Sequence, residues 1–127
     1  MNPIYNTINR IKSLIITDDL IKGYSIKAEE LGEEEGYIRV KVDLINGGVL
    51  EFFEYLILER DSVKIDKYSF HWQDKSGQLL KRWDNARHHR EIRSFPDHIH
   101  MPDGQVEVSK KLDLQNVLQI VKEEIKK

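Results

Sequence analysis

The sequence lacks cysteine, long apolar runs and a dominant sign of charge. Without cysteine, the chain can form neither disulfides nor metal sites built on thiolates. No apolar run approaches the roughly 18 residues that a membrane-spanning helix needs. The first residues, MNPIYNTINRIKSL, show neither the apolar segment nor the cleavage site of a secretory signal peptide. We therefore expect a cytoplasmic protein without a membrane segment.

The charges are balanced overall and uneven locally. The net charge is −2, from 20 basic and 22 acidic residues, which says nothing about a nucleic-acid partner. Residues 29–35, EELGEEE, contain five glutamates, whereas residues 81–93, KRWDNARHHREIR, contain five basic and two acidic residues. A solvated surface is the simplest interpretation of either block alone. The second block differs because histidines and Trp83 are interleaved with its arginines.

Hydrophobic periodicity predicts a helix near each end of the chain. At residues 4–16, isoleucines recur at three- and four-residue steps, after an Asn2 that suits a helix cap and a Pro3 that suits the first helical position. At residues 114–125, a second apolar stripe follows Asp113, another residue suited to capping. With 127 residues, we expect residues 1–127 to form a single domain.

Between the helices, alternating patterns predict five strands. The strands cover residues 24–28, 37–44, 49–59, 62–73 and 78–83, with a turn at Asn46-Gly47-Gly48 and a bulge near Asp66-Lys67. Residues 49–59, VLEFFEYLILE, are apolar on both faces, as in a central strand covered on both sides. The order predicts an α+β fold: a five-stranded antiparallel meander sheet with N- and C-terminal helices and a long His/Arg-rich loop.

That loop is the segment 84–111, which has neither a helical nor a strand period over any long window. It holds four of the five histidines. Such a long irregular segment in a compact domain is usually functional or disordered. Because it also contains apolar residues such as Ile92 and Phe95, which favour burial, we expect an ordered loop that packs on the sheet.

The residue types in and around this loop suit RNA cleavage without a metal or other cofactor. We assign His88, His98 and His100 as candidate catalytic residues, because imidazole titrates near neutral pH and can act as base and then as acid. Arginine forks suit phosphate, and aromatic rings can stack on unpaired bases. The candidate substrate-binding residues are Tyr68, Arg82, Trp83, Arg87 and Arg90, and the supporting residues are His71, Asp84, His89 and Glu91.

Two other interpretations of the histidines stay open. In an extended chain, His98 and His100 would point to the same side and could share a divalent ion with a nearby carboxylate. The candidate third ligands are Asp84, Glu91, Asp97 and Asp103. Alternatively, the histidines cap backbone groups of the loop and the arginines pair with its carboxylates. In that case the protein would be a non-catalytic module that binds protein or nucleic acid.

The region 68–100 resembles the TumE family of prokaryotic toxin–antitoxin proteins. Three motifs carry the resemblance: YSFHWQD at residues 68–74, LLKRWDNA at 79–86 and HHREIRSFPDHIH at 88–100. The chain departs from the family pattern at Arg87 and Arg90, where proline is expected, and at Asp97, where histidine is common. The resemblance implies a toxin whose partner is an antitoxin with a helix-turn-helix DNA-binding domain, but it supplies no set of catalytic residues.

The leading hypothesis is therefore a toxin that acts as a metal-independent endoribonuclease, with RNA and the antitoxin as its partners. The alternatives are the non-catalytic interaction module and a metal-dependent hydrolase that uses the His98-x-His100 pair. An exposed edge strand at residues 24–30 would also allow pairing with a second copy, so a homodimer is a further expectation.

Overall fold

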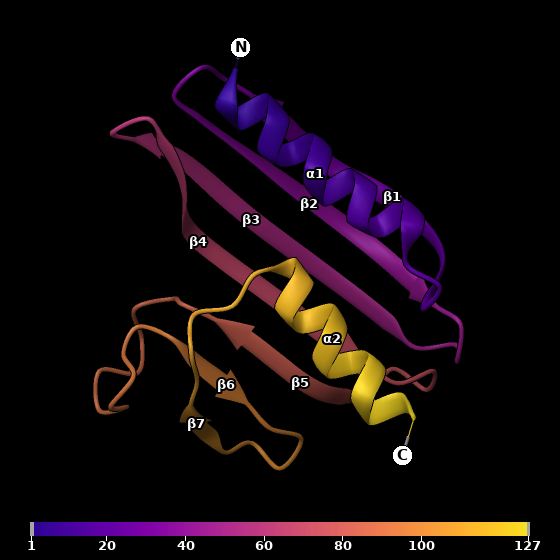
Figure 1. The fold of residues 1–127 in the computed structure, drawn as a ribbon. Helices are drawn as coiled ribbons and strands as arrows, with labels where there is room; N and C mark the ends of the chain where they lie inside the picture. Colours follow the sequence, from indigo (N-terminus) through magenta and orange to yellow (C-terminus); the bar gives the residue numbers. More distant parts are fainter. Residues whose placement is uncertain (1, 127) are drawn as a thin grey trace.

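The computed structural model describes residues 2–126, which form two helices and seven strands (Figure 1). The elements are α1 (Pro3–Thr17), β1 (Ile21–Leu31), β2 (Glu35–Leu44), β3 (Val49–Glu59), β4 (Ser62–Gln73), β5 (Leu79–Asp84), β6 (His98–His100), β7 (Val106–Val108) and α2 (Leu114–Ile125). The strands form one sheet in which each pairs antiparallel with its neighbour in chain order. The predicted α+β class, the two helices and the antiparallel meander are confirmed.

Both helices begin at the predicted caps. The Asn2 side chain accepts hydrogen bonds from the backbone N–H groups of Ile4 and Tyr5, at 3.0 and 3.2 Å. The Asp113 side chain accepts one from Asn116, whose own side chain accepts from the Asp113 backbone N–H. These bonds satisfy donors that the first helical turn leaves unpaired. Neither helix in residues 2–126 is long and apolar enough to cross a bilayer.

The two helices lie on the same side of the sheet and leave the other side uncovered (Figure 1). On β2, Ile38, Val40 and Val42 are fully buried beneath the helices, whereas the alternate residues Arg39 and Lys41 are partly exposed. We call the side that carries α1 and α2 the helix face and the opposite side the open face. The core therefore occupies one side of the sheet, and the other side is available to solvent.

Strand β3 corrects one expectation. Its apolar residues on both faces predicted cover on both sides, but α1 and α2 cover only the helix face. Phe52 is fully buried there, whereas Phe53 and Tyr55 lie partly exposed on the open face. The apolar residues of β3 therefore divide between the core and a partly exposed face, and no second core layer within residues 2–126 covers them.

The sheet has seven strands, so the prediction of five strands followed by a long loop was wrong. Strands β6 and β7 both lie within residues 84–111, and each is three residues long. Three residues are too few to produce a readable alternation in the sequence. The turn between these strands contains Gly104 at φ +87°, a conformation that favours glycine.

Two finer predictions agree with the structure. In the β3–β4 ladder, Tyr55 pairs with Lys67 and Leu56 with Ile65, so Asp66 is the extra residue of the expected bulge. Strand β1 is an edge of the sheet, as expected for residues 24–30, and it extends further in both directions.

Candidate functional site

Four polar side chains from β5 and β6 share the open face. The register pairs Arg82 with His100 and Asp84 with His98, so these residues lie side by side on neighbouring strands. Trp83, between the two β5 residues, points to the other side and is buried in the core. The alternation of strand side chains therefore places a guanidinium, a carboxylate and two imidazoles together.

The two imidazoles of β6 contact each other and the same carboxylate. His98 Nε2 lies 3.1 Å from His100 Nε2 and 2.9 Å from Asp84 Oδ1. His100 Nε2 lies 3.3 Å from Asp84 Oδ2. The expectation that His98 and His100 point to the same side is confirmed by these distances.

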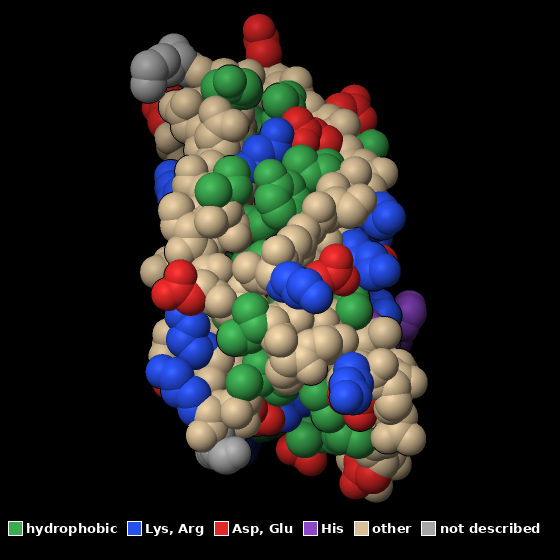
Figure 2. Space-filling model, turned by 90° about the vertical axis from the view of Figure 1, so that its right-hand side faces the viewer, with side chains coloured by type: hydrophobic (Ala, Val, Ile, Leu, Met, Phe, Trp, Pro, Cys, Tyr) green, Lys and Arg blue, Asp and Glu red, His purple; other side chains and the backbone are tan. Residues whose placement is uncertain are grey.

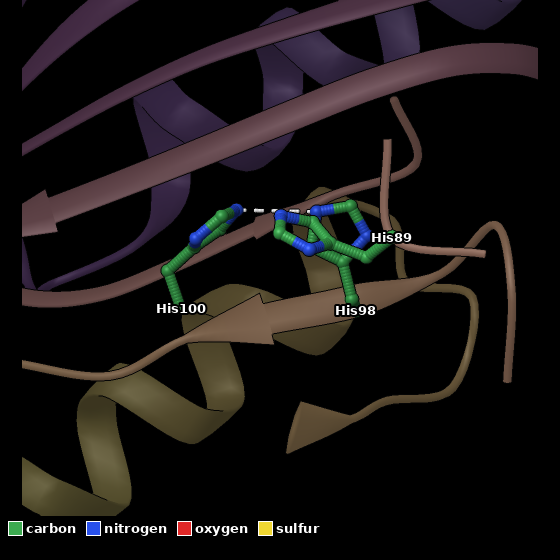
Figure 3. A group of neighbouring side chains, drawn as sticks. All are labelled: His89, His98 and His100. Atoms are coloured by element: carbon green, nitrogen blue, oxygen red, sulfur yellow. Dashed lines mark hydrogen bonds between the residues drawn. The ribbon is translucent and has the colours of Figure 1, made fainter. Parts of the chain in front are cut away.

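A third imidazole, His89, reaches the pair from the segment between β5 and β6 (Figure 3). Its ring centroid lies 5.0 Å from that of His98 and 5.6 Å from that of His100. One ring nitrogen from each of the three histidines falls within 4.8 Å of the others. We call His89, His98, His100 and Asp84 the histidine cluster.

The cluster is buried at its base and open at its rim. Asp84 and His98 are 4% and 2% exposed, whereas the side chains of His89 and His100 keep about 30% of their surface. Burial lowers the pKa of His100, although the nearby Asp84 carboxylate acts in the opposite direction. A reactant in solvent would therefore meet His89 and His100 first, while His98 is reached only through its neighbours.

Backbone and side-chain contacts hold the cluster in place. Asp84 accepts hydrogen bonds from the Ala86 backbone N–H at 3.0 Å and from Arg82 Nε at 3.1 Å. His98 Nδ1 donates to the carbonyl oxygen of Pro96 at 2.9 Å, since a carbonyl can only accept. These contacts fix the ring of His98 with its Nε2 directed into the cluster.

The remaining predicted site residues have different surroundings. His88 is exposed and does not join the histidine cluster, whereas its neighbour His89 does. Arg87 and Arg90 are exposed, with their guanidinium groups 5.7 and 5.4 Å from the centroid of the Phe95 ring. His71 lies on the open face, opposite Arg82 on β5.

Both aromatic residues predicted to stack on bases are buried. Trp83 and Tyr68 are 3% and 2% exposed, so neither offers a ring face to solvent. The Tyr68 hydroxyl donates to Asp97 at 2.7 Å, and burial together with this carboxylate raises the pKa of Tyr68 well above its usual value. Glu91 is exposed and lies 3.3 Å from His89 Nδ1. A backbone N–H and the His89 ring hold the pKa of Glu91 below its ordinary value.

Two hollows lie beside Arg82, and the first also adjoins Asp84. The first has a volume of about 660 Å³ and is lined by residues that include Asp84, Arg87 and Lys67. The second, of about 380 Å³, is lined by residues that include Arg39 and Lys41. Both hollows share Ser69 and Arg82. In the side view of Figure 2, Lys and Arg side chains lie along the right-hand edge next to a histidine.

Aromatic rings of β2 and β3 lie partly exposed on the open face, and Phe53 lines the first hollow. The rings of Tyr37 and Tyr55 are nearly parallel at 12°, with centroids 6.1 Å apart, and Phe53 lies 6.0 Å from Tyr37. The Arg39 guanidinium lies 4.7 Å from the Phe53 centroid. The signal was present in the sequence, because these residues alternate with the core residues of β2 and β3.

Comparison with models of protein families finds a match over residues 11–127 to the model described as Toxin TumE. Comparisons with curated proteins and with solved structures find no match. The matched range includes all seven strands, α2 and every residue of the histidine cluster.

Proposed function

Because this chain belongs to the TumE family of toxins, we propose that it is the toxin of a toxin–antitoxin pair and that it cleaves RNA on its open face. The observation that carries the proposal is the convergence of His89, His98 and His100, the last two against Asp84, beside the exposed guanidinium of Arg82. Imidazoles can move protons or hold a metal ion, and a guanidinium can stabilise the charge of a phosphate in the transition state.

The open face supports RNA as the substrate. Unpaired bases stack on aromatic rings, and Tyr37, Phe53 and Tyr55 keep part of their rings exposed on this face. Arg39 and Arg82 lie along the same face and can contact backbone phosphates. A single strand that crosses these rings would bring its phosphates to the rim of the histidine cluster.

Two chemical modes fit the cluster. In the metal-independent mode, one imidazole removes the proton of a ribose 2′-OH and a second group protonates the leaving 5′ oxygen. The Nε2 atoms of His98 and His100 are only 3.1 Å apart, so a phosphate cannot lie between them. This mode would therefore pair His100 with His89 or with a group across the groove. In the metal-dependent mode, the nitrogens hold an ion that activates water or the phosphate.

Cleavage of a labelled single-stranded RNA by the purified full chain tests the proposal. We expect fragments from the wild type and a loss of at least ~100-fold in rate for His100→Ala, because that ring lies at the open rim. The variant, purified in the same way, also controls for contaminating ribonuclease. Fragments that end in 2′,3′-cyclic phosphate and still form in the presence of EDTA indicate the metal-independent mode. Loss of cleavage in EDTA indicates the metal-dependent mode.

A wild-type protein that inhibits growth but cleaves no RNA would overturn the proposal. If His100→Ala then inhibited growth equally, the protein would be the non-catalytic interaction module instead.

The remaining partners are also proposals: a helix-turn-helix antitoxin, as the family resemblance implies, and a second copy paired along the β1 edge. Size-exclusion chromatography, with and without a candidate antitoxin of this type, tests both.

A further inference from the structure

The nitrogen atoms of the histidine cluster have the spacing of metal ligands. Around a tetrahedral zinc ion with Zn–N distances of about 2.0–2.1 Å, two ligand nitrogens lie roughly 3.3 Å apart. His98 Nε2 and His100 Nε2 are 3.1 Å apart, and a nitrogen of His89 lies within 4.8 Å of both. A small movement of His89, which lies in the segment between β5 and β6, would bring all three nitrogens onto one ion.

The outer contacts of the rings match those of metal-bound imidazoles. A ligating histidine usually donates its second ring N–H to a carbonyl or a carboxylate, which fixes the tautomer and the ring orientation. His98 Nδ1 donates to the Pro96 carbonyl at 2.9 Å, which directs Nε2 into the cluster, where it lies 2.9 Å from Asp84 Oδ1. His89 Nδ1 lies 3.3 Å from Glu91 Oε1, the carboxylate version of the same contact. Two of the three rings are therefore oriented to present their other nitrogen.

Asp84 supplies an oxygen beside the same point. Its Oδ1 lies 2.9 Å from His98 Nε2, whereas its Oδ2 is 3.1 Å from Arg82 Nε. Oδ2 also lies 3.3 Å from His100 Nε2, so Oδ1, which is closer to an imidazole nitrogen, is the oxygen nearer to a bound ion. The carboxylate is 4% exposed, so its charge would act on the ion with little screening by solvent.

From this geometry we infer that His89, His98 and His100 bind one divalent transition-metal ion, Zn²⁺ above all, with the fourth position shared between Asp84 Oδ1 and solvent. Three imidazoles and no thiolate favour Zn²⁺ and other divalent first-row transition metals over Mg²⁺ or Ca²⁺, which prefer oxygen ligands. The inference concerns the site of the proposed function but does not require that RNA be the substrate. An ion there would polarise a phosphoryl oxygen or activate a water molecule.

Isothermal titration of Zn²⁺ into the full chain, first stripped with EDTA and dialysed, tests the inference. We expect one ion per chain and a loss of affinity of at least ~100-fold in both His89→Ala and His100→Ala, since each lacks a ligand. Glu91→Ala, which removes only an outer contact, should lose roughly tenfold. The matched control is His88→Ala, which removes an exposed histidine next to His89 and should bind zinc like the wild type.

Thermal unfolding with and without Zn²⁺ supplies a second readout that also checks folding. An ion that binds only the folded chain raises Tm, so zinc should stabilise the wild type and His88→Ala but neither ligand variant. Failure of the wild type to bind zinc, or undiminished binding in both ligand variants, would overturn the inference. Zinc binding at these residues without RNA cleavage would support it and overturn only the proposed function. Conversely, cleavage without zinc binding would overturn the inference alone.

Discussion

Asp84 determines the arrangement of the site at the scale of single residues. It is the partner that Arg82, His98 and His100 share, and its burial makes each of those contacts stronger than it would be in water. The sequence analysis placed it among the supporting residues and among four candidate third ligands of an ion. It could not identify the shared partner, because that depends on the register between β5 and β6, which are separated by thirteen residues of chain.

Glu54 is a second buried carboxylate, on the helix face, and it gives a prediction about stability. It is 2% exposed and accepts a hydrogen bond from the Leu114 backbone N–H at 3.1 Å. Burial raises the pKa of Glu54 to about 7, although that hydrogen bond opposes the rise. The folded chain therefore binds this proton more tightly than the unfolded chain, whose carboxyl has a pKa near 4.5. The contribution to stability is full below pH 4.5 and is lost as the pH rises to 7.

Replacing Glu54 with Gln should remove this dependence, because the amide oxygen can still accept from Leu114 and carries no charge. We expect the variant to exceed the wild type in unfolding free energy at pH 8, by on the order of 2 kcal/mol, and to match it near pH 4.5. Urea unfolding at the two pH values measures the difference, with the exposed substitution Glu33→Gln as a surface control. A gain that is equal at both pH values would contradict the explanation.

At the scale of elements, the short strands β6 and β7 matter most for the site, because β6 places His98 and His100 beside β5. Most of the fold was predictable from periodicity, because α1, β2 to β4 and α2 are long enough to repeat their patterns. The two short strands were not, since three residues cannot display a period and their pairing depends on contacts with β5. Phe53 and Tyr55 of β3 were also assigned to a covered face, because an apolar residue on an open face looks like a buried one in the sequence.

The turn between β6 and β7 should be sensitive to a single methyl group. Gly104 adopts φ +87° there, so Gly104→Ala should lower the unfolding free energy by about 1 kcal/mol or more. Gly23→Ala on β1 is the matched control, because no atom lies within 4 Å of the added methyl and its φ is outside the left-handed range. Chemical denaturation compares the two variants. Equal midpoints would show that the turn does not depend on this conformation.

At the scale of the whole molecule, the core and the candidate site lie on opposite sides of the sheet. The helix face carries the core, with α1 and α2 packed over it, whereas the open face carries the histidine cluster and the exposed aromatic rings. Both hollows are lined by Arg82, and one of them is lined by both Phe53 and Asp84. Under the proposed function, this arrangement presents an extended surface to a strand of RNA without exposing the core.

The adjacent residues His88 and His89 allow the most direct test of the central claim, that the histidine cluster is the working centre of the toxin. The measurement is growth after induced expression of each alanine variant, at matched protein levels. The account predicts that His89→Ala loses toxicity, because it removes a member of the cluster, whereas His88→Ala, at an exposed position outside it, still arrests growth. Full toxicity of His89→Ala would contradict it, whatever the result for His88→Ala.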